Sequence, residues 1–85
     1  MTYYNLGIVY SDMGNIQKAI DSLKKAIELN PNLAQAYNNL SILYLRQNEY
    51  DLAVQYFNKA EKLGFVDTDL KEALKPYLQE INENK

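Results

Sequence analysis

The stretch YYNLGIVYSDMGNIQKAIDSLKKAIEL, residues 3–29, recurs without a gap as YNNLSILYLRQNEYDLAVQYFNKAEKL, residues 37–63, at an offset of 34 residues. A fixed period of this size is typical of repeat proteins, in which each repeat is one supersecondary unit. The question of function therefore moves from catalysis toward surfaces. The positions that are identical in the two copies are Tyr3/Tyr37, Asn5/Asn39, Leu6/Leu40, Ile8/Ile42, Tyr10/Tyr44, Ala19/Ala53, Lys25/Lys59, Ala26/Ala60 and Leu29/Leu63.

The composition of this 85-residue chain excludes several classes of function. It contains neither cysteine nor histidine, so a disulfide, a thiolate metal site and the commonest general base are all missing. We therefore expect a protein that is not an enzyme, with no catalytic residue, no cofactor and no metal.

The charge and the hydropathy of the chain argue against two further kinds of partner. The net charge is −2 and no basic stripe is visible, so we expect no nucleic acid. No apolar run approaches the roughly 20 residues that span a bilayer, and no secretory signal is visible. We expect no membrane partner, and a cytoplasmic location, because the lack of cysteine fits a reducing compartment.

Apolar residues at three- and four-residue steps predict four amphipathic helices in the two copies. Gly14 and Pro31 mark two helix ends, because glycine suits the left-handed closing residue and proline cannot continue the hydrogen-bond ladder. Loops of two or three residues force consecutive helices to lie antiparallel. The stripe of the first helix that we expect to be buried is Tyr3, Leu6, Tyr10 and Met13. The helices are expected over about residues 2–13, 16–29, 33–46 and 50–63.

The segment after residue 66 breaks the repeat and predicts a fifth helix. Asp67 or Thr68 can cap its start, and Pro76 in its middle is expected to kink or distort it. A terminal helix with a polar outer side covers the apolar end of a solenoid. We therefore expect residues 67–85 to form a capping helix, with a frayed end over residues 82–85. Its apolar face is Leu70, Ala73, Leu74, Tyr77, Leu78 and Ile81.

At Tyr3, Leu6, Gly7, Tyr10, Ala19, Leu23 and Pro31, and again at their counterparts 34 residues later, the chain resembles the tetratricopeptide repeat family, whose signature is a fixed spacing of aromatic, small, large apolar and proline residues. The resemblance implies an all-α fold of antiparallel helical hairpins, stacked as a short right-handed superhelical solenoid. It divides the chain into a first repeat at 1–33, a second repeat at 34–66 and the capping helix at 67–85. The signature stands as Tyr3, Leu6, Gly7, Tyr10, Ala19, Leu23 and Pro31, and again as Tyr37, Leu40, Ser41, Tyr44, Ala53 and Phe57, with Phe65 at the position of the proline.

The number of repeats is small for such an array. Three or more repeats are usually needed for stability, and this chain has two and a cap. We expect either an excised or terminal piece of a longer array, or a domain that gains burial by self-association.

The resemblance also implies where a partner would bind. In this family the first helix of each hairpin lines a concave groove, which holds an extended peptide or a helix of a partner protein. Asn5 and Asn39 could grip a peptide backbone there, or they could bond to the neighbouring helix backbone. The apolar residues among the groove candidates could anchor a partner, or they could pack against a neighbouring repeat or a second copy of the chain. The candidate groove residues are Tyr4, Asn5, Ile8, Asp12, Asn38, Asn39, Ile42, Leu45 and Arg46.

One groove chemistry of the family is a clamp for the acidic C-terminal tail of heat-shock chaperones, built from lysines, asparagines and an arginine. Only Asn39 matches that clamp in this chain, and Asp69 would repel an acidic tail. We therefore do not expect a chaperone tail as the partner. The positions that correspond to the clamp are Tyr4, Ile8, Asn39, Asp69 and Ala73.

We expect a non-catalytic scaffold for protein–protein interaction, which binds a peptide or a helical segment of another protein in the groove. Arg46, the only arginine, offers one ionic contact to a partner or else forms a solvated ion pair of little energetic consequence. The alternative is a structural, self-assembling repeat module that stacks or dimerises through its exposed ends.

Overall fold

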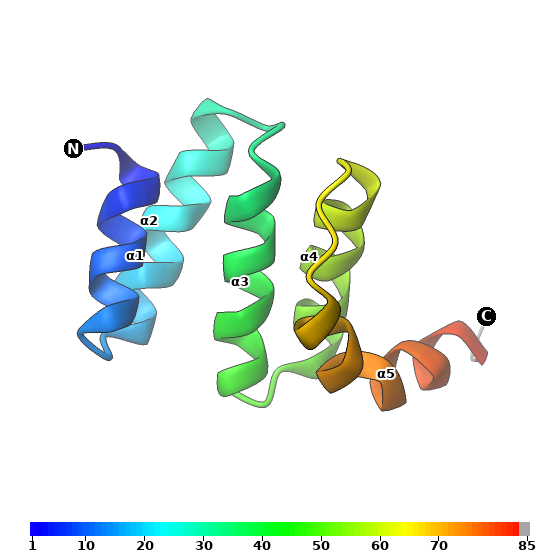
Figure 1. Ribbon diagram of the computed structural model, residues 1–85. Helices are drawn as coiled ribbons and strands as arrows, with labels where there is room; N and C mark the ends of the chain where they lie inside the picture. Colours follow the sequence, from blue (N-terminus) through cyan, green and yellow to red (C-terminus); the bar gives the residue numbers. More distant parts are fainter. Residues whose placement is uncertain (84–85) are drawn as a thin grey trace.

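The computed structural model describes residues 1–83, with side chains described through Leu78. Figure 1 shows the helices stacked from α1 and α2 at one end, through α3 in the middle, to α4 and α5 at the other. The predicted all-α class, a solenoid of stacked antiparallel hairpins, is confirmed. The helices are α1 (Tyr3–Asp12), α2 (Ile16–Leu29), α3 (Ala34–Arg46), α4 (Tyr50–Lys62) and α5 (Thr68–Glu83).

The residues at the helix starts and in the turns have the side chains or the backbone freedom that these positions require. Thr2, Asn15 and Asp67 each accept a hydrogen bond from the backbone amide three residues later, at 3.1, 3.3 and 3.1 Å. Each bond satisfies one of the amides that a helix start leaves unpaired, and Asp67 is thus the cap of α5. The turns inside the two hairpins contain Gly14 at φ 79° and Asn48 at φ 61°. Asparagine is one of the few residues besides glycine that tolerate this left-handed region.

The core lies where α3 packs between α2 and α4. Leu23, Leu40, Leu43 and Phe57 are each 1% exposed or less. Small residues between them allow the helices to approach closely. The remaining buried members of this cluster are Ala19, Ile20, Ala36, Tyr44, Ala53, Val54, Leu70 and Leu74.

The glycine of the repeat signature lies where the two helices of the first hairpin touch. A Cβ added at Gly7 would lie 2.7 Å from Cγ of Leu23 and 3.3 Å from the carbonyl oxygen of Ala19. In the second repeat Ser41 takes this position, is fully buried and donates from its hydroxyl to the carbonyl oxygen of Ala53 at 2.6 Å. The second repeat thus has a buried hydroxyl at this position, and the carbonyl of Ala53 satisfies its hydrogen-bonding capacity.

Two residues that were expected in the buried stripe of α1 lie at the surface instead. Tyr3 is 44% exposed and Met13 is 70% exposed. The reason is that α1 packs mainly against α2, whereas α3 packs between two helices. Tyr37, the counterpart of Tyr3, is 8% exposed; its ring stacks on Tyr56 and its hydroxyl donates to the carbonyl oxygen of Pro31 at 2.9 Å. The same signature residue is thus core or surface depending on whether a further helix covers it.

Helix α5 covers the open side of the second hairpin. Leu70 and Leu74 are buried in the core cluster, and the ring of Tyr77 stacks on Tyr50 of α4 with 4.0 Å between ring centroids. The helix continues through Pro76.

Helix α5 extends to Glu83, and the fraying of residues 82–85 stays a prediction. Of the predicted frayed end, residues 84–85 lie outside the described residues.

Candidate functional site

The surface between α1 and α3 contains a hollow of about 240 Å³. Its floor is apolar, because Leu23 and Leu43 reach it from the core. Ile8 and Ile42, which occupy equivalent positions of the two repeats, are half-buried beside this floor. The lining residues are Ile8, Ser11, Asp12, Leu23, Asn39, Ile42, Leu43 and Arg46.

Five of the nine predicted groove residues line this one hollow. They come from α1 and α3, the first helices of the two repeats, which lie side by side in Figure 1. Sequence positions that are equivalent by the 34-residue offset therefore meet on one surface. These five residues are Ile8, Asp12, Asn39, Ile42 and Arg46.

A sixth predicted residue, Tyr4, is joined to this group by a hydrogen bond. The Nδ2 of Asn39 donates to the hydroxyl oxygen of Tyr4 at 3.2 Å, so a side-chain bond connects α3 to α1. The bond uses one donor of Asn39, whose Oδ1 accepts no hydrogen bond from the described residues. An amide oxygen of this kind can accept a hydrogen bond from the backbone N–H of a ligand.

Two exposed charges of opposite sign, Asp12 and Arg46, border the hollow. The described residues form no ion pair that includes either of them. Both charges are thus available to a ligand, and their sum leaves the hollow without net charge.

Asn5 and Leu45 lie outside the hollow. The side chain of Asn5 is exposed, and its backbone amide donates to the cap residue Thr2. Leu45 is half-buried and packs against the core cluster. The two repeated asparagines therefore differ in role, because Asn39 has Tyr4 as a partner and Asn5 has no such neighbour among the described residues.

The expectation that Asn38 lines the groove needs correction. Its side chain is 5% exposed, and its Nδ2 donates to Oδ2 of Asp67 at 3.0 Å. The bond connects α3 to the residue that caps α5, so Asn38 holds the capping helix in place. Its Oδ1 is buried without a hydrogen-bond partner among the described residues. Sequence spacing could not reveal this, because the two residues are far apart in the chain.

Asp67 is expected to make stability depend on acid pH. The hydrogen bond from Asn38, followed by the backbone bond from Leu70, lowers the pKa of Asp67 below its ordinary value of 3.8. Because the folded state favours the carboxylate, the stabilisation is fully present above the ordinary pKa and is lost as pH falls through the lower folded pKa. Asp67→Asn keeps a capping side chain that cannot titrate. Between about pH 5 and about pH 2, the range over which such carboxylates titrate, the free energy of unfolding of this variant should therefore fall less than that of the wild type. Urea unfolding at several pH values measures this, and an unchanged pH dependence would contradict it.

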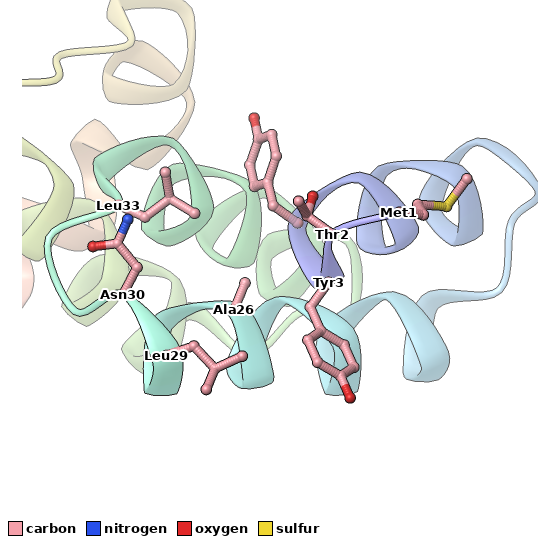
Figure 2. Close-up of a pocket in the computed structure, with 8 residues that line it drawn as sticks. Met1, Thr2, Tyr3, Ala26, Leu29, Asn30 and Leu33 are labelled. Carbon is pink, nitrogen blue, oxygen red and sulfur yellow. The ribbon is translucent and has the colours of Figure 1, made fainter.

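A second, larger pocket was missed by the sequence reasoning. It has a volume of about 470 Å³ and lies between the start of α1 and the end of α2 (Figure 2). In this view Ala26 and Leu29 of α2 lie on one side of the pocket and Thr2 lies on another side of it. The exposed apolar pair Tyr3 and Leu29 was a signal for it, but Tyr3 was assigned to the repeat signature, and Leu29 was given no role beyond its identity with Leu63. The lining residues are Met1, Thr2, Tyr3, Tyr4, Ala26, Leu29, Asn30 and Leu33.

The structure also bears on metal binding and on membrane spanning. Within the part of the chain that the structure describes, no three acidic, histidine or cysteine side chains come close enough together to hold a metal ion. No described helix is both long and apolar enough to cross a bilayer.

The sequence matches known proteins over most of its length. Residues 1–63 match the family model described as tetratricopeptide repeat. The chain is 30% identical over 75 residues to the photosystem I assembly protein Ycf3 of Rippkaea orientalis, covering 72% of this chain and 43% of that protein. It is 36% identical over 58 residues to human tetratricopeptide repeat protein 6, covering 68% of this chain and 11% of that protein.

A solved structure shows the same fold. The crystal structure of YrrB, described as a TPR protein with an unusual peptide-binding site, matches with a TM-score of 0.82 and 28% sequence identity. The match covers 94% of this chain and 41% of that one. The chain thus spans less than half the length of the Ycf3 proteins and of the solved structure that it matches.

Proposed function

We propose that this chain, which belongs to the tetratricopeptide repeat family, is a non-catalytic scaffold that binds a peptide or helical segment of another protein between α1 and α3. Proteins of this family generally mediate protein–protein interaction and are not enzymes. The assembly role stated in the name of the Ycf3 relatives agrees with a function exerted through protein partners. We also propose that the repeats are residues 1–33 and 34–66 and that residues 67–85 are their cap.

The observation that carries this proposal is the hollow between the first helices of the two repeats. It combines an apolar floor with an amide and two charges around it. Sites that recognise peptides use this combination, because an apolar recess accepts an anchor side chain while a few polar groups fix its orientation. Asn39 supplies the amide, Ile8 and Ile42 the apolar contacts, and Asp12 and Arg46 the charges.

The charges restrict the kind of segment that would bind. Asp12 would repel an acidic group of the ligand, whereas Arg46 would attract an acidic group. We infer that the bound segment contains an apolar anchor residue flanked by charges of both signs, and that it is not an acidic chaperone tail. The small volume of about 240 Å³ fits one side chain of moderate size.

Replacing Ile8 by alanine is expected to weaken binding of such a ligand about tenfold, because anchor contacts contribute roughly 1–2 kcal/mol and 1.4 kcal/mol is a factor of ten. The ligand is a peptide selected from a random display library against the immobilised chain. Fluorescence polarisation then measures its affinity for the wild-type and variant chains.

Val66→Ala is the matched control, because Val66 is also apolar and exposed but lies between α4 and α5. It should leave the affinity unchanged. If both variants bind as tightly as the wild type, the peptide sits elsewhere and the groove assignment fails.

A further inference from the structure

Helix α5 has, one repeat later, the register that α3 has in the second repeat. It begins at Thr68, which is 34 residues after Ala34, the first residue of α3. Leu74, the counterpart of Leu40 by the same offset, is 0% exposed as Leu40 is. The period of the buried side chains therefore continues into α5, although the repeat signature does not, and the capping helix takes the place of the first helix of a further repeat.

This register assigns Pro76 to the groove position of α5. Its counterparts are Ile42 and, one repeat earlier, Ile8, and both of them line the hollow between α1 and α3. Ala73 corresponds in the same way to Asn39, which supplies the amide of the hollow. Pro76 and Ala73 are both exposed. The groove positions of α1 and α3 are therefore continued on α5 by a proline ring and a methyl group.

The proline in α5 is costly for the helix, and core packing does not offset its cost. Proline is the least favourable residue inside a helix, because it removes a backbone hydrogen bond and its ring crowds the preceding turn. The core contacts of α5 are made by Leu70, Leu74 and Tyr77, whereas Pro76 is exposed. Residues that break a local rule without a gain in packing are expected at functional sites. The reason for Pro76 is therefore sought on the surface of α5.

Pro76 leaves one backbone acceptor of α5 without its helical donor. In an α-helix the carbonyl oxygen of Glu72 would accept a hydrogen bond from the amide of residue 76, and proline has no N–H to donate. Glu72 is exposed and lies one turn before Pro76, on the same side of the helix. A bound segment can therefore donate to this carbonyl oxygen without displacing any hydrogen bond of the helix.

We propose that the carbonyl oxygen of Glu72 and the ring of Pro76 form a second contact site for the partner segment, in which the oxygen accepts one backbone N–H of that segment. This contact rests on the proposed function, because the same segment places its anchor side chain in the hollow between α1 and α3. An extended segment has backbone N–H groups free to donate, whereas a helix beyond its first turn uses them internally. The partner segment is therefore extended, and not helical, where it crosses α5.

The side of α3 lies between the two contacts. Leu45, the counterpart of Ser11 in the hollow, is half-buried there, and Arg46 is exposed. The hydrogen bond of 3.0 Å between Asn38 and Asp67 joins α3 to the start of α5, so the two helices are held together. The longest dimension of the molecule is 41 Å. At about 3.4 Å per extended residue, a segment of about 12 residues is therefore long enough to make both contacts.

Pro76→Ala tests the proposal, because alanine supplies the missing N–H to the carbonyl of Glu72 and suits a helix better than proline. The probe is a peptide of about 15 residues, selected from a random display library against the full chain and longer than the segment needed for both contacts. Its affinity, measured by fluorescence polarisation, should fall roughly threefold to tenfold, the loss of one net hydrogen bond. The Tm measured by circular dichroism should rise, so damage to the fold cannot explain the weaker binding.

N-methylation of each peptide amide in turn identifies the donor. One methylation should weaken binding to the wild type and leave binding to Pro76→Ala unchanged, because the acceptor is already occupied in that variant. Lys75→Ala is the matched control, since Lys75 is exposed in the same helix and its replacement frees no carbonyl; it should bind like the wild type. The proposal is overturned if Pro76→Ala binds as tightly as the wild type, if Lys75→Ala loses as much affinity, or if every methylation affects both chains equally. A peptide weakened by Ile8→Ala but not by Pro76→Ala overturns the α5 contact alone, and a peptide that neither variant weakens overturns the groove as well.

Discussion

Leu40→Ala is expected to lower the free energy of unfolding by about 2–5 kcal/mol, the range observed for large-to-small substitutions in protein cores. Leu40 is 0% exposed in α3, the helix that packs between α2 and α4. The substitution would leave a cavity inside the buried core cluster. Whole domains have total stabilities of roughly 5–15 kcal/mol, so the variant should be largely unfolded at moderate urea concentrations. Urea titration followed by circular dichroism measures the loss.

Leu45→Ala provides the comparison within the same helix. Leu45 is only half-buried, so its truncation removes fewer packing contacts and leaves a site that solvent can fill. Its loss of stability should be clearly smaller than that of Leu40→Ala. Equal losses would show that the centre of the core has been placed wrongly.

The second large effect is expected at the cap, where Leu74→Ala should cost roughly 2–5 kcal/mol for the same reason. Leu74 is 0% exposed and belongs to the same core cluster as Phe57 and Leu40. If α5 is a cap that the array needs, its loosening exposes the apolar side of α4 and destabilises the whole unit. The unfolding transition should therefore stay a single cooperative step at a lower urea midpoint.

Lys75→Ala is the control for the cap, because Lys75 is an exposed neighbour in the same helix and its contact with Glu72 is an exposed pair. Exposed substitutions of this kind usually change stability by less than about 0.5 kcal/mol. The capping role would be refuted if Leu74→Ala left the urea midpoint where it is in the wild type.

The fold could be predicted from the sequence because the two copies repeat the pattern of core residues. Leu40, Ala53 and Phe57 are buried as the signature requires. The prediction was wrong at Tyr3 and Met13, since a pattern states which face of a helix is apolar but not whether another helix covers it. Their exposure depends on the position of α1 at the end of the stack.

The candidate site was predicted less completely. Ile8, Asp12 and Arg46 line one hollow, because equivalent positions on the first helices of successive repeats share one surface, and their role in binding stays a prediction. Asn38 was misplaced, since its partner Asp67 belongs to the cap, outside the repeat, and no periodicity connects them. The pocket beside Met1 was missed because it lies at a helix start and end, where the repeat pattern carries no information about shape.

We propose that the groove between α1 and α3 receives a segment of another protein. Backbone amide chemical shifts of the labelled chain, recorded by NMR during titration with the library-selected peptide, test it most directly. The largest shifts should occur at the residues around the hollow, from Ile8 to Asp12 and from Asn39 to Arg46, with small shifts on the outer sides of α2 and α4. Largest shifts on the outward side of α1, on α5, or spread evenly over the chain would contradict it.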